Sequence, residues 1–309
     1  MTDALRTVRD FIRYAVSRAG AAGVVQGQGF DSALDEACFL VLRSLHLPHD
    51  LPPAYAGAAL LDDERTLLLD RIERRVTERV PAAYLVGEAW FCGLSFAVGE
   101  GVLIPRSPIA ELIEQGFEPW LDGQAPARIL DLCTGSGCIG IACAMQFADA
   151  EVDLVDLSPA ALGFASRNLG QYELAGRVRA LQGDLFGPLT GQQYDLIVSN
   201  PPYVADAEVD ALPQEFSHEP ALALRSGADG LDLPLRILAA AADHLQPGGW
   251  LVLEVGGAGA SLHEALPAIE ADWPEFERGG DGVLVLSAAA VAAIAPAAQQ
   301  LCRQRQLEI

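Results

Sequence analysis

Apolar residues recur every three or four positions through the first 80 residues, which is the spacing of one buried face on an α-helix. Three such stretches stand out, and the capping pair Asp31-Ser32 precedes the second. Their apolar positions are Leu5, Val8, Ile12, Ala15 and Val16; Leu34, Cys38, Val41, Leu42 and Leu45; and Leu69, Ile72, Val76 and Val80. The pattern predicts a small helical domain over residues 1–82.

The period changes to two between Tyr84 and Ile104, where glycines interrupt an alternating apolar run. This pattern is typical of a β-hairpin, and we expect it to form a linker over residues 83–107. From about Pro108 to the end, helical and strand patterns alternate, as they do in a doubly wound, mostly parallel sheet. The sequence therefore predicts an α/β domain over residues 108–309.

The first predicted strand of this domain, residues 127–132, runs into a glycine-rich turn and then into a helix. Glycine lets the backbone approach a ligand closely, and the free N–H groups of a first helical turn favour an anionic group. Gly135, Gly137 and Gly140 also satisfy G-x-G-x-x-G, which is typical of nicotinamide and flavin enzymes. This turn alone leaves a dinucleotide-binding oxidoreductase open as an alternative.

Acids end the next two predicted strands. Asp156 lies about twenty residues past the glycine turn, where an acid can bind both ribose hydroxyls of a nucleotide or nucleoside. Asp184 follows the third strand and is placed to accept from an adenine amino group, with Leu185 beside it to cover the ring. Because ligands bind at the carboxyl ends of the strands in such sheets, we expect these residues to share one site.

A tetrad, Asn200-Pro201-Pro202-Tyr203, follows the apolar run Leu196-Ile197-Val198-Ser199. An amide or exocyclic amine delocalises its nitrogen lone pair, so a methyl acceptor of this kind must be held by its N–H groups with that lone pair aimed at an electrophile. The Asn200 side-chain oxygen and the Pro201 carbonyl can accept these N–H groups, Pro202 stiffens the loop, and Tyr203 can stack on the planar group. The tetrad therefore suits methyl transfer to a planar nitrogen.

These features together resemble the class I S-adenosylmethionine-dependent methyltransferases, and specifically the protein glutamine methyltransferases of the HemK type. The matching segments include Pro81-x-x-Tyr84-Leu85-x-Gly87-x-x-x-Phe91, Glu219-Pro220-x-x-Ala223-Leu224 and residues 245–254. The resemblance implies a seven-stranded sheet, S-adenosylmethionine as cofactor, and an N-terminal domain that recognises the substrate. It also implies the site: Cys133, Thr134, Gly135, Ser136 and Gly137 at the methionine end of the cofactor, Asp156 at its ribose, Asp184 and Leu185 at its adenine, and Asn200, Pro201, Pro202 and Tyr203 at the glutamine, with Asp131 and Asn200 also among the cofactor-binding residues.

One segment distinguishes two branches of this family. Release-factor enzymes usually carry Pro-Arg-Pro-(Asp or Glu)-Thr-Glu, whereas this chain reads Pro105-Arg106-Ser107-Pro108-Ile109-Ala110-Glu111. With Trp90-Phe91-Cys92-Gly93-Leu94, this departure resembles the branch that methylates ribosomal protein L three of the large subunit. The implied substrate is a glutamine of that protein, before or during ribosome assembly, and peptide-release factors are the alternative.

The net charge of the chain bears on which class of macromolecule it binds. The chain has 20 basic and 42 acidic residues, a formal net charge of -22, and residues 81–309 hold 10 Arg against 30 acids. Enzymes that methylate adenine or cytosine amines in nucleic acids share the tetrad, but they need a basic face, so we expect no strong direct nucleic-acid binding. An acidic surface would steer a basic protein substrate, although solubility alone would account for it equally well.

The remaining composition indicates an intracellular enzyme. The six cysteines form no C-x-x-C pairs and the five histidines show no zinc-type spacing, so we expect reduced thiols, no metal and a cytoplasmic location. The longest apolar stretch, Val283 to Ala298, is broken by Ser287 and Pro296 and predicts a strand and an alanine-rich helix rather than a membrane span. A scaffold that binds the cofactor without catalysis stays open as a further alternative.

Overall fold

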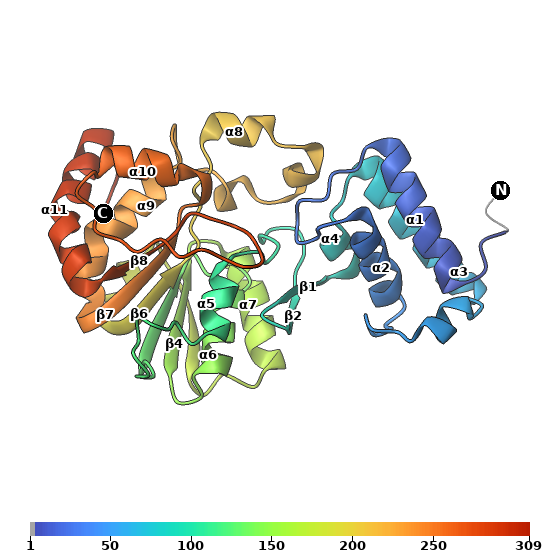
Figure 1. The fold of residues 1–309 in the computed structure, drawn as a ribbon, viewed down its shortest axis with the longest axis horizontal. Coiled ribbons are helices and arrows are strands. Elements are labelled where there is room, and N and C mark those ends of the chain that lie inside the picture. Colours follow the sequence, from blue (N-terminus) through green and yellow to red (C-terminus); the bar gives the residue numbers. More distant parts are fainter. Residues whose placement is uncertain (1–3) are drawn as a thin grey trace. The chain divides into compact units, whose positions relative to one another are not determined.

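The computed structural model describes residues 4–309, and the chain forms two compact units (Figure 1). The first, called the helical unit here, comprises residues 1–89, 98–100 and 212–218. The second, the sheet unit, comprises residues 90–97, 101–211 and 219–309. The chain therefore passes from the helical unit into the sheet unit and returns twice, for residues 98–100 and for residues 212–218, before it ends in the sheet unit.

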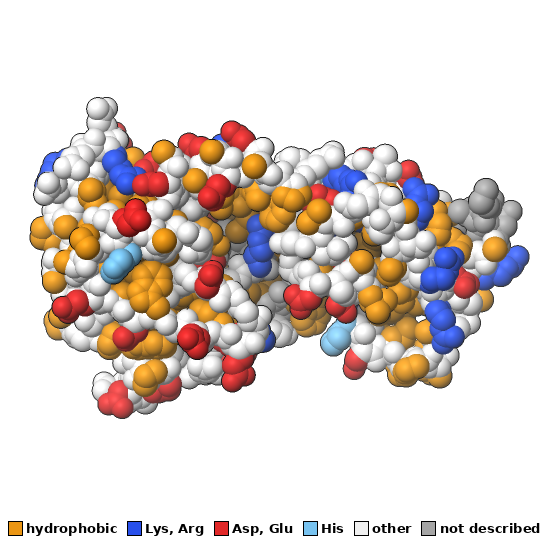
Figure 2. Space-filling view, turned by 45° about the horizontal axis from the view of Figure 1, so that its top comes forward, with side chains coloured by type: hydrophobic (Ala, Val, Ile, Leu, Met, Phe, Trp, Pro, Cys, Tyr) orange, Lys and Arg blue, Asp and Glu red, His pale blue; other side chains and the backbone are white. Residues whose placement is uncertain are grey.

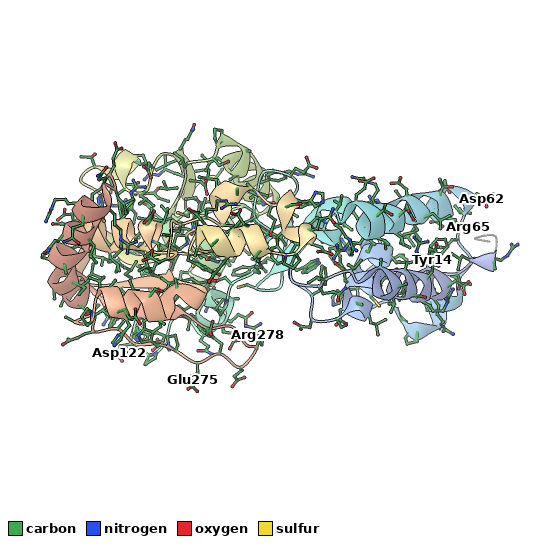
Figure 3. All side chains as sticks on the ribbon, turned by 90° about the horizontal axis from the view of Figure 1, so that it is seen from above. Tyr14, Asp62, Arg65, Asp122, Glu275 and Arg278 are labelled. Atoms are coloured by element: carbon green, nitrogen blue, oxygen red, sulfur yellow. The ribbon has the colours of Figure 1, made fainter. Side chains whose placement is uncertain are left out.

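The helical unit consists mainly of four helices: α1 (Val8–Ala22), α2 (Ala33–Ser44), α3 (Asp62–Glu73) and α4 (Ala82–Val86). Ser32 caps α2 as predicted, because its hydroxyl accepts from the Asp35 backbone N–H. Phe11, Val41 and Leu68 are fully buried, whereas Leu34 is 55% exposed. The predicted apolar face of α2 was therefore wrong at Leu34, which lies in the first turn and points outward. Residues Asp62 and Arg65 form an ion pair on α3 (Figure 3).

A buried ionic cluster lies inside the helical unit. Arg75, which is 3% exposed, donates to Glu36 at 2.9 Å. Glu215, from the distant segment 212–218, accepts from the Val25 backbone N–H at 3.0 Å and pairs with Arg79 at 3.3 Å. Burial raises the pKa of the Glu36 carboxyl, against the opposing effect of Arg75. These contacts join residues 212–218 to the core of the unit.

The large sheet of the sheet unit has six strands in the order β5-β4-β3-β6-β7-β8. Their bounds are β3 (Arg128–Leu132), β4 (Glu151–Asp156), β5 (Val178–Gln182), β6 (Tyr194–Ser199), β7 (Leu245–Glu254) and β8 (Val283–Ser287). All neighbouring pairs are parallel except β7 with β8, which is antiparallel. A separate hairpin joins β1 (Glu88–Phe91) to β2 (Leu94–Ala97). The α/β class and the doubly wound, mostly parallel sheet are therefore confirmed.

The predicted seventh strand is reduced to a single bridge within the described residues. Asp272 pairs with Val285 of β8 through two backbone hydrogen bonds of 3.0 and 2.9 Å. Pro and Gly residues surround this position, at Pro267, Pro274, Gly279 and Gly280, and they interrupt a continuous ladder. The expected seven-stranded sheet is thus a six-stranded one with an edge bridge.

Helices cover both faces of the sheet (Figure 1). Alternate residues of each strand point to opposite faces, so the unit has two apolar layers. One layer includes Leu130, Leu251 and Leu286 and packs against α9 (Asp232–Ala240) and α11 (Ala288–Arg305). The other includes Ile129 and Val252 and packs against α5 (Ile109–Glu114), α6 (Cys138–Gln146) and α7 (Pro159–Gln171). Two shorter helices, α8 (Asp206–Ala211) and α10 (Gly259–Ala265), lie in the connections.

The C-terminal apolar stretch forms β8 followed directly by α11, as predicted. Ser287 caps α11 by accepting from the Ala290 backbone N–H, and Pro296 lies within the helix. Among the described residues, no helix combines the length and apolar character needed to cross a membrane.

Candidate functional site

A cavity of about 240 Å³ opens in the sheet unit at the carboxyl ends of the parallel strands. The residues that follow β3, β4, β5 and β6 all contribute to its wall, among them Cys133, Asp156, Asp184 and Asn200. The strand ends that the sequence singled out therefore meet in one place. Of the predicted site residues, the wall includes Cys133, Thr134, Gly135, Ser136, Asp156, Asp184, Leu185, Asn200 and Pro202.

Asp131 lies behind the glycine-rich turn and is not among the lining residues. Its Oδ2 accepts from the Thr134 hydroxyl at 2.5 Å and from the Gly140 backbone N–H at 2.8 Å. Complete burial raises the pKa of the Asp131 carboxyl to about 7. A Cβ on Gly140 would come within 2.1 Å of Leu154, so only glycine allows this close approach. Asp131 therefore fixes the shape of the turn from within the protein.

The turn leaves polar groups available to a ligand. Ser136 lines the cavity, and its hydroxyl oxygen is buried without a hydrogen-bond partner among residues 4–309. The N-cap residue of α6, Gly137, has a left-handed φ of 83° and no side chain to cap the helix, and Asp131 takes only the Gly140 N–H of the first turn. Gly137 itself does not line the cavity, but Cys138 and Ile139 of the first helical turn do. This arrangement fits a ligand with an anionic or hydrogen-bonding end.

Asp156 ends β4 with both carboxylate oxygens facing backbone donors. Oδ2 accepts from the Gly135 N–H and Oδ1 from the Ser158 N–H, each at 2.8 Å. Burial raises the pKa of this carboxyl, and hydrogen bonds from Ser158 and Gly135 oppose the rise. A carboxylate has about four acceptor positions, so these bonds leave two for a ligand diol.

Asp184 and Leu185 form the next part of the wall. Asp184 pairs with Arg236 of α9 at 2.7 Å, and both residues line the cavity. Leu185 is buried, while Leu157, also in the wall, is half exposed. Together with Leu233 these side chains give an apolar surface beside an acid, which fits a planar heterocycle with an amino group.

The tetrad reaches the cavity with two of its four residues, Asn200 and Pro202. The Asn200 side-chain nitrogen donates to the Arg106 carbonyl at 3.4 Å, which leaves its amide oxygen as the group for a further donor. The Tyr203 hydroxyl donates to Glu254 at 2.8 Å, and neither Pro201 nor Tyr203 is among the lining residues.

Two segments of the cavity wall could not be predicted from the strand ends. Residues 101–107 and 220–225 both contribute to the lining, and a bidentate pair joins them, because Arg106 donates to Glu219 at 2.7 and 2.8 Å. Glu219 also accepts from the Ile104 N–H at 3.0 Å. The sequence marked these segments only through the family resemblance, since neither follows a strand of the large sheet.

The cysteines around the turn are poor nucleophiles. Burial raises the pKa of Cys138 to about 12, and burial also raises the pKa values of Cys133 and Cys143. Across residues 4–309 there is no cluster of three or more His, Cys, Asp or Glu side chains that could hold a metal ion.

Comparisons with known proteins show which family the chain is similar to. Residues 119–231 match the family model described as methyltransferase small domain. The chain is 54% identical over 284 residues to the ribosomal protein uL3 glutamine methyltransferase of Xanthomonas campestris pv. campestris, which covers 92% of each chain. The enzymes of the same name from Bordetella pertussis and Francisella tularensis subsp. tularensis are 51% and 46% identical, over 92% of this chain and 95% and 90% of theirs.

Among solved structures, TrmN from Thermus thermophilus is 24% identical, with a TM-score of 0.42, over 59% of this chain and 49% of that chain. The curated relatives are far closer and extend over nearly their whole length. By this identity and coverage, the chain belongs to the family of ribosomal protein uL3 glutamine methyltransferases.

Proposed function

We propose that this protein transfers a methyl group from S-adenosylmethionine to the side-chain amide nitrogen of a glutamine in ribosomal protein uL3. The observation that supports it most is the end of β6, where Asn200 lines a cavity that Asp156 also lines and uses its side-chain nitrogen within the protein, which leaves its amide oxygen for a ligand. The choice of uL3 as the substrate protein rests on the family to which the chain belongs. We also propose the cytoplasm as its location, where ribosomal proteins meet modifying enzymes before assembly.

The cavity residues suit the cofactor one by one. We propose that Asp156 accepts from the ribose hydroxyls, that Asp184 and Leu185 hold the adenine, and that the unpartnered Ser136 hydroxyl lies at the methionine end. Cys133, Thr134 and Gly135 complete that end. Bound S-adenosylmethionine supplies a methyl group already activated by its sulfonium.

The tetrad then has to position the acceptor. The Asn200 oxygen and the Pro201 carbonyl would accept the two amide N–H groups of glutamine, which aims the nitrogen lone pair into the cavity. Positioning of this kind can supply about 7–11 kcal/mol of the barrier. The same two oxygens favour the positive charge that grows on nitrogen during transfer. No strong base is required before transfer, and the proton can leave to water afterward.

A basic protein is the partner that the surface charge favours. Figure 2 shows acidic side chains spread over the visible face of the sheet unit, whereas many of the basic side chains in that view lie on the helical unit. No residue of the cavity wall belongs to the helical unit. We therefore propose that the helical region, predicted as residues 1–82, recognises the substrate protein rather than the cofactor.

The test offers purified uL3 and a peptide-release factor side by side, with labelled S-adenosylmethionine. We expect label on a uL3 glutamine and weaker labelling as salt rises, because unlike surface charges attract less when screened. Preferential labelling of the release factor would overturn the substrate, and labelling of a nucleic-acid amine would overturn the acceptor class. No labelling, with intact cofactor binding, would indicate a scaffold.

A further inference from the structure

The segment just before α5 is linked to both ends of the tetrad, directly at Asn200 and through Glu254 at Tyr203. The Arg106 carbonyl accepts from the side chain of Asn200, the first residue of the tetrad. The Ser107 hydroxyl donates to one carboxylate oxygen of Glu254, and the hydroxyl of Tyr203, the last residue of the tetrad, donates to the other. Two consecutive residues of one short segment are therefore linked to the tetrad at its start and at its end.

Glu254 is the centre of the second link. It ends β7, is 3% exposed, and accepts from hydroxyls that come from two different loops. Burial raises the pKa of the Glu254 carboxyl to about 7, and the charge of Asp281 adds to the rise. The hydrogen bonds from Ser107 and Tyr203 and the charge of Arg106 oppose it. Above that pH the carboxylate can accept both hydroxyl hydrogen bonds at once.

Close packing restricts Tyr203 in other directions. A Cβ on Gly256 would come within 2.5 Å of the Tyr203 ring, and a Cβ on Gly230 within 2.1 Å of its carbonyl oxygen. The backbone therefore approaches the tyrosine directly on two sides. Glu254 holds the hydroxyl at the end of the ring, so packing and this hydrogen bond together restrict the side chain.

The segment itself is anchored on its other side. The Ser107 hydroxyl also accepts from the Ile109 N–H at 3.1 Å, at the start of α5. The same helix carries Glu111, which accepts from the backbone N–H groups of Glu277 and Arg278 at 3.0 and 2.8 Å. Arg278 lies in the loop before β8 (Figure 3). Ser107 is thus fixed by its own helix while it holds Glu254.

We propose that Ser107 and Glu254 are positioning residues that set the orientation of Tyr203 in the tetrad, called the glutamine clamp here because it is proposed to hold the substrate glutamine. Through this link, the segment that distinguishes the two family branches acts on catalysis. The inference rests on the proposed function. The release-factor branch has proline after the arginine, and proline has no hydroxyl to donate to Glu254. In this chain the link therefore depends on a hydroxyl that the release-factor motif lacks.

The experiment compares Ser107→Ala, Ser107→Thr, Glu254→Gln and Tyr203→Phe, with Ser217→Ala as the matched control. Ser217 is an exposed serine whose hydroxyl donates only to the nearby Gln214 carbonyl. We expect Ser107→Ala and Tyr203→Phe each to lower kcat on uL3 about tenfold, and the double variant to lower it little further, because both act through Glu254. Ser107→Thr should restore most of the turnover. The affinity for S-adenosylmethionine should stay within about twofold of the native value.

Two readouts separate positioning from a merely structural role. The kcat of the native enzyme should rise with pH through about 7 as Glu254 ionises, and this rise should disappear in Glu254→Gln. Amide hydrogen exchange of Asn200 and of residues 203–205 in the free protein should quicken in Ser107→Ala and Glu254→Gln but not in Ser217→Ala. This second readout does not depend on activity, so it tests the link even if uL3 proves to be the wrong substrate.

Additive losses in the double variant together with unchanged exchange would overturn the proposal. A failure of every variant and of the native enzyme to methylate uL3 would instead overturn the proposed function. Equal loss of kcat and of cofactor affinity in Ser107→Ala would show that the serine serves the cofactor site and not the clamp, which also overturns the proposal.

Discussion

Replacement of Asp156 should separate two roles of one carboxylate. In the protein its oxygens accept from the Gly135 and Ser158 backbone N–H groups, and the two remaining acceptor positions face the proposed ribose. Asp156→Ala removes charged acceptors from the ligand, and hydrogen bonds to charged groups contribute about 1.5–3 kcal/mol. We therefore expect S-adenosylmethionine affinity to fall about 10- to 150-fold by titration calorimetry.

The same substitution should also lower the free energy of unfolding, because two backbone donors lose their acceptor. We expect a loss of about 1–3 kcal/mol in urea, limited by water that enters the open cavity. Asp156→Asn should not restore this loss. In either orientation of the asparagine amide, its NH₂ group faces one of the two backbone N–H groups. Two donors then face each other, and that hydrogen bond is lost.

An exposed aspartate outside the cavity wall, Asp149, provides the control. Asp149→Ala should change neither cofactor affinity nor unfolding beyond about 0.5 kcal/mol. Native affinity in Asp156→Ala would refute the ribose assignment. Native stability in Asp156→Asn would refute the reasoning that both oxygens serve as acceptors within the protein.

Three further outcomes follow from the structure. Asn200→Ala should lower kcat about a hundredfold or more in a methyl-transfer assay while cofactor affinity changes little, because the lost acceptor acts on the amide; near-native turnover would contradict the clamp. Glu215→Ala should lower the free energy of unfolding in urea by about 3 kcal/mol, because it removes a buried partner of Arg75 and Arg79; a loss below 1 kcal/mol would contradict this. Folded Glu254 has its pKa raised from 4.5 to about 7, so the folded state binds more protons and its stability should fall as pH rises between these values. Glu254→Gln should flatten that fall in urea titrations, and an unchanged slope would exclude Glu254 as its source.

Much of the cavity could be located from the sequence because strand ends are predictable. Apolar runs identify buried strands, and parallel strands bring their carboxyl ends to one edge, so the order of residues along the chain was enough to group Asp156, Asp184 and Asn200. Local patterns could not show which polar residues face inward. Asp131 belongs to the same glycine-rich stretch as Ser136, yet it turns into the protein to hold Thr134 and Gly140.

Contacts between segments far apart in the sequence could not be predicted from local patterns. In the sequence, Glu254 stands out only as the last residue of the family-matching segment 245–254, and nothing in its neighbours indicates the hydroxyls of Ser107 and Tyr203. Similarly, the period of α2 placed Leu34 on the apolar face, but its position in the first turn leaves it exposed. The edge bridge at Asp272 shows the same limit, because pairing with β8 depends on a partner far along the chain.

The return of residues 212–218 to the helical unit has a consequence for the order of folding during synthesis. Residues 1–89 leave the ribosome early, but Val25 and Arg79 lack their buried carboxylate until Glu215 has been made. By then β3 to β6 have also emerged. Domains usually fold as they are synthesised, beginning at the N-terminus. Here the first unit in sequence can reach its final packing only after most of the second has been translated, so the two are expected to mature together.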